Sequence, residues 1–430
     1  MKRIAMLLVM LAFLLSSSVM LFAGGDSEEK ADGPVTVSWW VLSGGGGADD
    51  PRTEHNKKIV ADFEASHPGI KIEMTVLENE AFKQKSQVAV QAGTPPDLFH
   101  SWGGGVMVEF AKSGMLRDVT DFAMGTLSKR IGIGTLGVFG YDGKYYGAPY
   151  DMGGVFMWYN KDIFKECGVN VPATFEELKD ACVKIKAKGY VPIALGAGDR
   201  WPAHFWWVYL AMRVGGIDAF NAAYGGSGSF KDEAFVRAGE LLLELAAVEP
   251  FQEGYLGATY NDEARMVGNG EAAMELMGHW APGVRKNNAG DAFVGDKFDI
   301  FTFPSVKGGA GDLKDVMGGG GGYIFGKDAP DEAMTFVDFL LSKEIQMEKA
   351  NPDIEGIIPV VKGAEAALEG ISVKIAESVA AAPYYQLYYD QYLPPAVGEA
   401  VKDAVVALLG GQVTPEGAAA MIDDAWQAEK

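Results

Sequence analysis

Aromatic rings and planar hydrogen-bonding groups occur together at several points where a predicted strand or apolar run gives way to a loop. These positions are Trp40 with Ser43, His100 with Trp102, Trp201 with His204, and Trp280. The flat C–H faces of a sugar pack on aromatic rings, and sugar hydroxyls need donors and acceptors such as those of Asp, His, Asn and Arg. In open α/β sheets, ligands collect at the carboxyl ends of strands. We therefore interpret these residues as a candidate sugar site.

Large aromatic side chains also fill cores, so each tryptophan has two interpretations. We assign Trp40, Trp102, Trp201 and Trp280 to ligand contact because they lie at strand ends or loop starts. The remaining tryptophans are assigned to cores, and these are Trp39, Trp158, Trp206, Trp207 and Trp426.

Motifs of enzyme chemistry are missing from the sequence. The glycine runs lack the G-x-G-x-x-G register and a phosphate-loop lysine, and neither H-E-x-x-H nor G-x-S-x-G occurs. The five histidines lack metal-ligand spacing. Acid pairs are too frequent for spacing to identify or exclude a glycosidase. We therefore expect a binding protein without a cofactor or a metal.

The net charge of −21 limits the possible partners. An acidic surface repels nucleic acid and anionic membranes, so neither is expected as a partner. It also disfavours a strongly anionic ligand, unless a local basic pocket binds it.

The first 23 residues are typical of a signal peptide. Lys2 and Arg3 precede an apolar run over residues 4–15, three serines follow, and cleavage is expected after Ala23. The run is too short for a transmembrane helix. Residues 24–34 are predicted to be a flexible leader. No cysteine lies near the expected cleavage point, so we expect no lipid anchor and a periplasmic location.

Cys167 and Cys182 are the only cysteines. They could form one disulfide or remain two buried thiols, and the sequence leaves both possibilities open.

Strands and helices are predicted to alternate, which indicates an α/β fold with mostly parallel sheets. Strands are expected at residues 35–42, 70–76 and 298–303 and within PPDLFHSW. Helices are expected from the cap at Asp49 or Asp50 to residue 66, and at 79–92, 174–188, 203–214, 231–248, 331–349 and 396–409. The five-glycine run 318–322 suits a hinge or a close backbone approach.

Nearly the whole chain after the leader resembles the family 1 extracellular solute-binding proteins, the maltose-binding-protein-like components of ABC sugar importers. The segments that carry the resemblance, in order, are VSWW, PPDLFHSWGG with SGMLRDVTD, YYGAPYDMGGVFMWYNKDIFKECGV, GNGEAAMELMGHW, the glycine run with GGYIFGKDAPDEAMTFVDFLLSKEIQ, and YYDQYLPPAVGEAVKDAVVALLGG.

The resemblance implies two α/β lobes with the ligand in the cleft between them. The N-lobe would comprise residues 35–149 and 300–317, and the C-lobe residues 150–299 and 318–430. Crossings between the lobes would lie at 148–150, 298–301 and 316–319.

The resemblance also assigns roles to residues of this sequence. The loop from Trp40 to Gly47, which contains Ser43, and Trp102 would form the N-lobe wall, with His100 nearby. Trp201, with His204 behind it, and Trp280 would be aromatic platforms of the C-lobe. Asp151 and Asp390 would accept hydroxyl hydrogen bonds.

The function implied is that of a monomeric periplasmic binding component, which delivers a neutral mono- or oligosaccharide to the permease subunits of an ABC importer. Other ligands of the same fold remain as alternatives, among them a polyol, a phosphate ester or a polyamine, as does a secreted glycosidase. A phosphate ester would need a cation, for which Arg200 is a candidate.

Overall fold

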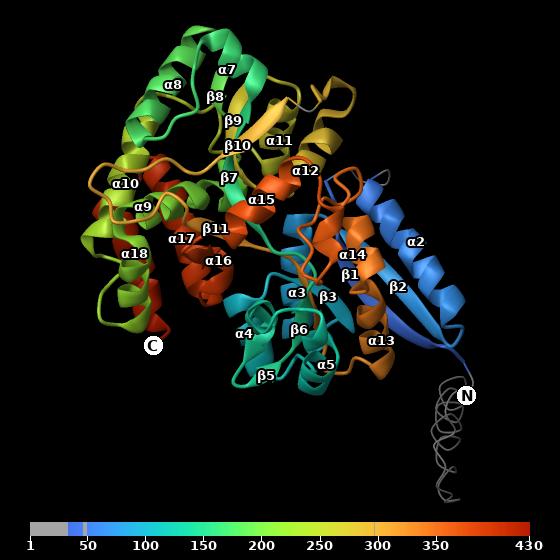
Figure 1. Cartoon of the computed structure of the whole chain (residues 1–430). Helices are drawn as coiled ribbons and strands as arrows, with labels where there is room; N and C mark the ends of the chain where they lie inside the picture. Colours follow the sequence, from blue (N-terminus) through green and yellow to red (C-terminus); the bar gives the residue numbers. More distant parts are fainter. Residues whose placement is uncertain (1–32, 46–49, 296) are drawn as a thin grey trace, which may run out of the picture. The chain divides into compact units, whose positions relative to one another are not determined.

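The computed structural model describes residues 33–45, 50–295 and 297–430, and Val35–Lys430 forms one compact unit (Figure 1). The predicted signal peptide 1–23, most of the leader 24–34 and residues 46–49 of the first glycine loop lie outside the described residues. None of the helices in the described residues is long and apolar enough to span a bilayer.

The first lobe is built on a five-stranded sheet in the order β2-β1-β3-β12-β6. Its strands are β1 (Val35–Leu42), β2 (Ile70–Leu77), β3 (Leu98–Ser101), β6 (Gly147–Pro149) and β12 (Gly322–Phe325). β1 pairs in parallel with β2 and β3, whereas β12 runs antiparallel to β3 and β6. β1, β2, β3 and β6 therefore run in the same direction and only β12 is reversed, which agrees with the predicted mostly parallel sheet.

Helices cover both faces of the first sheet. They are α2 (Pro51–Ser66), α3 (Asn79–Gln91), α4 (Gly104–Lys112), α5 (Thr120–Gly125), α6 (Ile133–Leu136), α13 (Asp331–Leu340) and α14 (Lys343–Lys349), with the 3₁₀ turns η2 (Leu127–Lys129), η3 (Gly137–Phe139) and η6 (Ala364–Ala367). A short hairpin joins β4 (Gly140–Tyr141) and β5 (Lys144–Tyr145). Asp50 caps α2 and Pro51 begins it, as predicted.

Side chains of β1 alternate between the two faces of the first sheet. Val37, Trp39 and Val41 are buried with residues of α2 and α13. Trp40 and Leu42 pack on the opposite face, against the cluster formed with α3 and α4. The two-residue period of a strand accounts for this division.

The second lobe is built on a mixed sheet in the order β13-β11-β7-β9-β8, with β10 paired to β7. Its strands are β7 (Gly153–Asn160), β8 (Val191–Ile193), β9 (Ala272–Gly278), β10 (Phe298–Phe301), β11 (Val316–Gly319) and β13 (Tyr385–Leu387). β7 runs antiparallel to β9, β10 and β11, and only the β8–β9 and β11–β13 pairs are parallel.

The helices of the second lobe surround one continuous hydrophobic core. They are α7 (Lys161–Cys167), α8 (Phe175–Ala187), α9 (Trp201–Gly225), α10 (Glu233–Ala246), α11 (Tyr260–Gly268), α12 (Ala281–Ala289), α15 (Ile371–Ala380), α16 (Tyr389–Tyr392), α17 (Pro395–Leu409) and α18 (Pro415–Ala428), with the 3₁₀ turns η4 (Ala197–Asp199) and η5 (Gly290–Ala292).

The tryptophans assigned to cores are buried as predicted. They are Trp39 in the first lobe and Trp158, Trp206, Trp207 and Trp426 in the second. Cys167 and Cys182 are buried free thiols, which settles the alternative that the sequence left open. Burial raises the pKa of the Cys182 thiol to about 12.

Within the described residues, the chain passes between the two lobes at three short segments. Residues 150–152 join β6 to β7, and residues 320–321 join β11 to β12. Residues 368–370 join η6, which packs on α14, to α15, which packs on β7.

The structure corrects the predicted lobe boundaries. Residues 300–317 belong to the second lobe, since Ile300 in β10 pairs with Trp158 in β7. The predicted crossing at 298–301 was therefore wrong. Residues 322–367 belong to the first lobe because β12 joins its sheet and Phe336 of α13 joins its core, so the second lobe does not take in all of 318–430. Which strands pair is not encoded in the local pattern of one strand, so the sequence could not assign β10 and β12 to a lobe.

Close backbone approach accounts for the glycine run 318–322. A Cβ at Gly320 would lie 1.8 Å from the Asp151 carbonyl oxygen, and one at Gly322 would lie 2.0 Å from Cζ of Phe139. None of these five glycines has a positive φ. Glycine is needed here because two segments that connect the lobes lie against each other.

Candidate ligand-binding site

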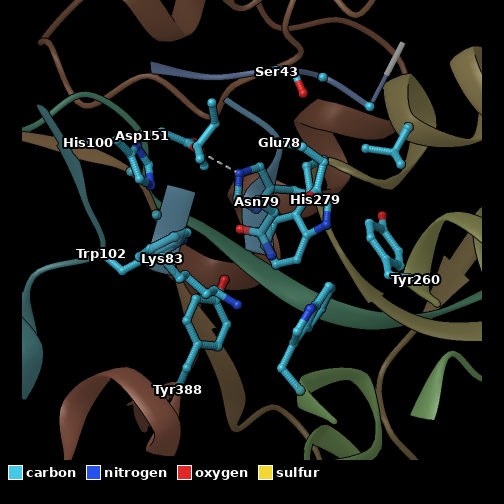
Figure 2. A pocket seen from close by; sticks show the side chains of 18 of the residues that line it. Ser43, Glu78, Asn79, Lys83, His100, Trp102, Asp151, Tyr260, His279 and Tyr388 are labelled. Atoms are coloured by element: carbon cyan, nitrogen blue, oxygen red, sulfur yellow. Dashed lines mark hydrogen bonds and ion pairs between the residues drawn. The ribbon is translucent and has the colours of Figure 1, made fainter. Parts of the chain in front are cut away.

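A cavity of about 150 Å³ lies between the two lobes and is lined by both (Figure 2). The first lobe contributes the carboxyl ends of β1, β2 and β3 and the start of α3. The second lobe contributes the end of β9, the starts of α9, α11 and α12, and residues 388–391. Strand ends and helix starts of both lobes therefore converge on one space.

Most of the predicted site residues line this cavity. They are Ser43, His100, Trp102, Asp151, Trp201, Trp280 and Asp390. Ser43 follows β1, Trp102 follows β3, and Trp280 follows β9 by two residues. Trp201 begins α9, directly after Arg200, whose backbone has a φ of 65°. Trp102 and Trp280 thus lie at the carboxyl ends of strands, as the strand-end rule predicted, whereas Asp151 and Asp390 were indicated by the family resemblance.

Trp40 does not line the cavity, contrary to the prediction. It lies on the face of β1 that packs against the cluster containing Phe82, Phe99 and Met107. The strand reaches Leu42, two residues beyond Trp40, so its end is supplied by Leu42 and Ser43. Trp40 is consequently a packing residue of the first lobe.

His204 also lies outside the lining. Its side chain is fully buried, one turn into α9. Nδ1 donates to the carbonyl oxygen of Trp201 at 2.7 Å, and Nε2 lies 3.5 Å from Oδ1 of Asp390. His204 therefore supports two lining residues from behind and does not reach the cavity itself.

The wall formed by the second lobe is aromatic. Trp201 lies with its ring centre 6.3 Å from that of Trp280 and 4.8 Å from that of Tyr260. Tyr388 lies 6.1 Å from Trp280 and stacks on Phe205 at 5.4 Å. These rings position one another, so the apolar surface is formed before a ligand enters.

Six buried polar atoms of lining residues have no hydrogen-bond partner among the described residues. They are Nε2 of His100, Nε1 of Trp201, the hydroxyl oxygens of Tyr260 and Tyr388, Nδ1 of His279 and Nε of Arg52. An unpaired buried polar atom costs roughly 1–3 kcal/mol, so such atoms are uncommon in native proteins. Four of these atoms lie in the second lobe and two in the first. A ligand with several hydroxyl groups would supply the missing partners.

His100 is neutral at ordinary pH. Burial lowers the pKa of its imidazole to about 3, and the positive charges of Arg52 and Lys83 act in the same direction. Nδ1 lies 3.1 Å from the hydroxyl of Tyr150. A neutral imidazole has one donor and one acceptor nitrogen, so Nε2 suits a hydroxyl group, which can fill either role.

Asp151 connects a crossing segment to both lobes. Oδ2 accepts from Nε2 of His279 at 2.7 Å (Figure 2). Oδ1 accepts from the backbone N–H of Ile358 at 2.8 Å. A Cβ at Gly153 would meet Nδ1 of His279 at 2.1 Å, so the backbone approaches the ring closely. Both carboxylate oxygens of Asp151 therefore have protein partners.

The sequence missed several lining residues. They include Arg52, Glu78, Asn79, Lys83, Tyr150, Tyr260, Tyr388 and Gln391. Glu78 and Asn79 follow β2, so the rule of strand ends could have identified them. Tyr388 and Gln391 lie at the start of and within the short helix α16, far along the chain, where no local pattern indicates a cavity.

The charges of Arg52 and Asp390 are both balanced by neighbours. Arg52 lies 3.8 Å from Glu355, a carboxylate that is also bonded to Lys349 at 2.6 Å. Burial would raise the pKa of Glu355, but Lys349, His55 and Arg52 outweigh it and hold the pKa at about 2. Burial likewise opposes ionisation of Asp390, while neighbouring positive charges lower its pKa.

Arg200, the candidate cation for a phosphate ester, is engaged outside the cavity. It contacts Asp403 at 2.6 Å and Glu399 at 2.9 Å, both in α17. It does not line the cavity.

The chain matches the bacterial extracellular solute-binding protein family over residues 53–347 and belongs to that family. An uncharacterized ABC transporter extracellular-binding protein of Pyrococcus horikoshii is 29% identical over 52% of this chain and 52% of its own length. The multiple sugar-binding protein of Streptococcus mutans is 28% identical over 71% of this chain and 72% of its own length.

A solved structure from a study of xylan utilization by Caldanaerobius polysaccharolyticus has the same fold. It superposes with a TM-score of 0.84 at 26% identity and covers 91% of this chain and 99% of its own. The two-lobed α/β architecture is therefore that of the solute-binding proteins, which is a family of binding proteins and not of enzymes.

Proposed function

We propose that this protein is the substrate-binding component of an ABC importer and that its ligand is a neutral mono- or oligosaccharide. The observation that carries this proposal is the coexistence, in one cavity between the lobes, of aromatic rings and the unpartnered atoms of His100, Trp201 and Tyr388. A sugar matches both features, because its C–H faces pack on rings and its hydroxyls donate and accept.

Relatives support this choice of ligand. One is described as a multiple sugar-binding protein, and a structural neighbour comes from work on xylan utilization. Contacts from both lobes give the ligand a higher affinity for the closed arrangement, which shifts the population toward it. In this proposal the closed, loaded monomer is the form that the permease subunits bind.

The site residues fall into two roles in this proposal. Trp102, Trp201 and Trp280 supply apolar faces, and His100, Ser43 and Asp390 bind hydroxyl groups. Asp151 fixes the geometry of the crossing through His279 and Ile358, since its oxygens already have partners. A hydrolytic role for Asp151 is disfavoured for the same reason, which supports a binding protein over a glycosidase.

We propose a periplasmic location, with residues 1–23 directing export. Membership of an extracellular family is consistent with this location.

A thermal-shift screen against a library of neutral sugars tests the proposal. A ligand at 100 times its dissociation constant raises the free energy of unfolding by about 2.7 kcal/mol, so a true ligand gives a clear shift. Chromatography of the sugar after incubation should recover it unchanged. The proposal would be contradicted if no sugar raised the midpoint temperature of thermal unfolding, or if the protein turned the sugar over catalytically.

A further inference from the structure

Lys83 places an ammonium group between aromatic rings that belong to different lobes. It lies in α3, and its Nζ is 5.6 Å from the ring centre of Trp102 and 5.7 Å from that of Trp201. Both distances are within the range of a cation–π interaction. Figure 2 shows Lys83 beside Trp102 in the cavity. We call the space between these two rings the aromatic slot.

The ammonium is held from one side only. Nζ donates to Oε1 of Glu80 at 2.8 Å, one turn earlier in the same helix. Glu80 is its one hydrogen-bond partner within the described ranges, although an ammonium carries three donors. The side chain remains 22% exposed. Its position therefore follows from one carboxylate and two rings, and not from a buried charge network.

Three carboxylates belong to the surroundings of the aromatic slot. Glu78 and Asp390 line the same cavity, and Glu80 contacts Lys83 directly. The charge of Lys83 also reaches Asp390, where it adds to the neighbouring positive charges that lower the pKa of that carboxyl against the effect of burial. Two tryptophan rings bordered by carboxylates are the composition of sites that bind organic cations. In this protein the cation is supplied by the chain itself.

We propose that Lys83 is a specificity-determining residue, whose ammonium occupies a cation-binding slot and thereby excludes amine-bearing solutes in favour of neutral sugars. This inference rests on the proposed sugar-binding function. The net charge of −21 attracts small cations toward the molecule, so their exclusion has to be local. Lys83 excludes them in two ways, since its ammonium occupies the position of a cation between the two rings and repels a second positive charge.

Replacement of Lys83 by methionine removes the charge and keeps a long apolar side chain. Lys85→Met is the matched control, because Lys85 lies on the same helix, is exposed and does not line the cavity. The probes are choline, which needs no sugar site, and the pairs glucose with glucosamine and galactose with galactosamine. Calorimetric titration gives each dissociation constant, and thermal unfolding shows that each variant is folded.

The expected result is at least tenfold tighter choline binding by Lys83→Met than by the wild type or Lys85→Met. For any sugar pair that binds, the affinity ratio of amino sugar to neutral sugar should rise at least tenfold in Lys83→Met alone. Lys83→Gln provides a second uncharged variant if the methionine variant does not fold.

Equal choline affinity in the wild type and in a folded Lys83 variant would overturn the inference, as would an equal gain in Lys85→Met. This outcome differs from failure of the proposed function, in which the wild type binds no neutral sugar at all. The choline comparison remains decisive in that case, because it examines the slot alone.

Discussion

The polar atoms around the cavity differ in whether the protein already satisfies them. Asp151 is bonded through both oxygens, so its role is to hold a crossing segment in place. His100, Trp201 and Tyr388 each present a buried polar atom without a partner. A ligand that completes these three bonds gains their full benefit, since leaving them unmade costs free energy in the empty cavity.

Two tryptophan substitutions distinguish a ring that lines the cavity from a ring that packs in the core. Trp280→Ala should weaken sugar binding by about 1–2 kcal/mol and leave the fold intact, because the ring lies at the cavity. Trp40→Ala should leave sugar affinity unchanged and lower the unfolding midpoint, because its ring packs within the first lobe. Calorimetry and thermal unfolding measure both effects. The reverse pattern would show that the two rings have been assigned to the wrong roles.

His100 should make the stability of the protein sensitive to acid. The pKa of His100 is lowered to about 3 in the folded state, whereas an unfolded histidine titrates near 6.5. Between these values the unfolded chain binds the extra proton, so stability falls as the pH is lowered. From pH 7.5 to 5.0 the wild type should lose about 2 kcal/mol more than His100→Asn, as a pKa difference of this size requires. Urea unfolding at the two pH values measures this difference, and parallel losses in both proteins would contradict the account.

Most helices and strands followed from local patterns, but their grouping into lobes did not. β1 and β2 were predicted from apolar alternation, and α2 from its cap and proline, because those signals are local. β10 was placed at a crossing although it pairs with β7, and β12 was placed in the wrong lobe. Pairing between distant strands depends on the whole sheet, which no short segment encodes.

Glycines at the start of α4 bring the first lobe against the second. A Cβ at Gly105 would lie 2.1 Å from the carbonyl oxygen of Leu393, and one at Gly104 would lie 2.5 Å from that of Gln391. Gln391 belongs to α16 and Leu393 to the turn between α16 and α17, both in the second lobe. A side chain at Gly105 would therefore obstruct the contact between the lobes.

Gly105→Ala should fold normally and bind sugar at least about tenfold more weakly, because closing the lobes would force its Cβ into the backbone of Leu393. Gly134→Ala is the matched control, since no atom lies within 4 Å of a Cβ there. Affinity is measured by calorimetry and folding by thermal unfolding. Equal affinity in both variants would mean that this contact plays no part in binding.

The two lobes meet on both sides of the cavity. On one side, α4 contacts the turn after α16. On the other, Asn287 donates to the carbonyl oxygen of Gly44 at 2.9 Å, and Lys286 pairs with Asp353 at 2.8 Å. The cavity is therefore bordered by polar and backbone contacts between the lobes. Such boundaries suit a cleft that opens and closes.

At the scale of the whole molecule, the sequence predicted the family and the position of the cavity better than it predicted which residues line the cavity. Strand ends indicated Trp102 and Trp280. The sequence did not indicate Tyr388, which lies beyond β13, or Lys83, which lies in α3. The three-dimensional structure was needed to place both at the cavity. Both are brought to the cavity by tertiary packing, for which no single segment carries a signal.

The central claim is that a neutral sugar binds between the lobes, and a crystal structure with the sugar that gives the largest thermal shift tests it most directly. The account predicts a sugar ring within about 4 Å of the Trp201 or Trp280 ring. It also predicts hydroxyl groups hydrogen-bonded to Nε2 of His100, Nε1 of Trp201 and the hydroxyl of Tyr388. A sugar bound elsewhere on the protein, or bound in the cavity with all three atoms still unpartnered, would contradict it.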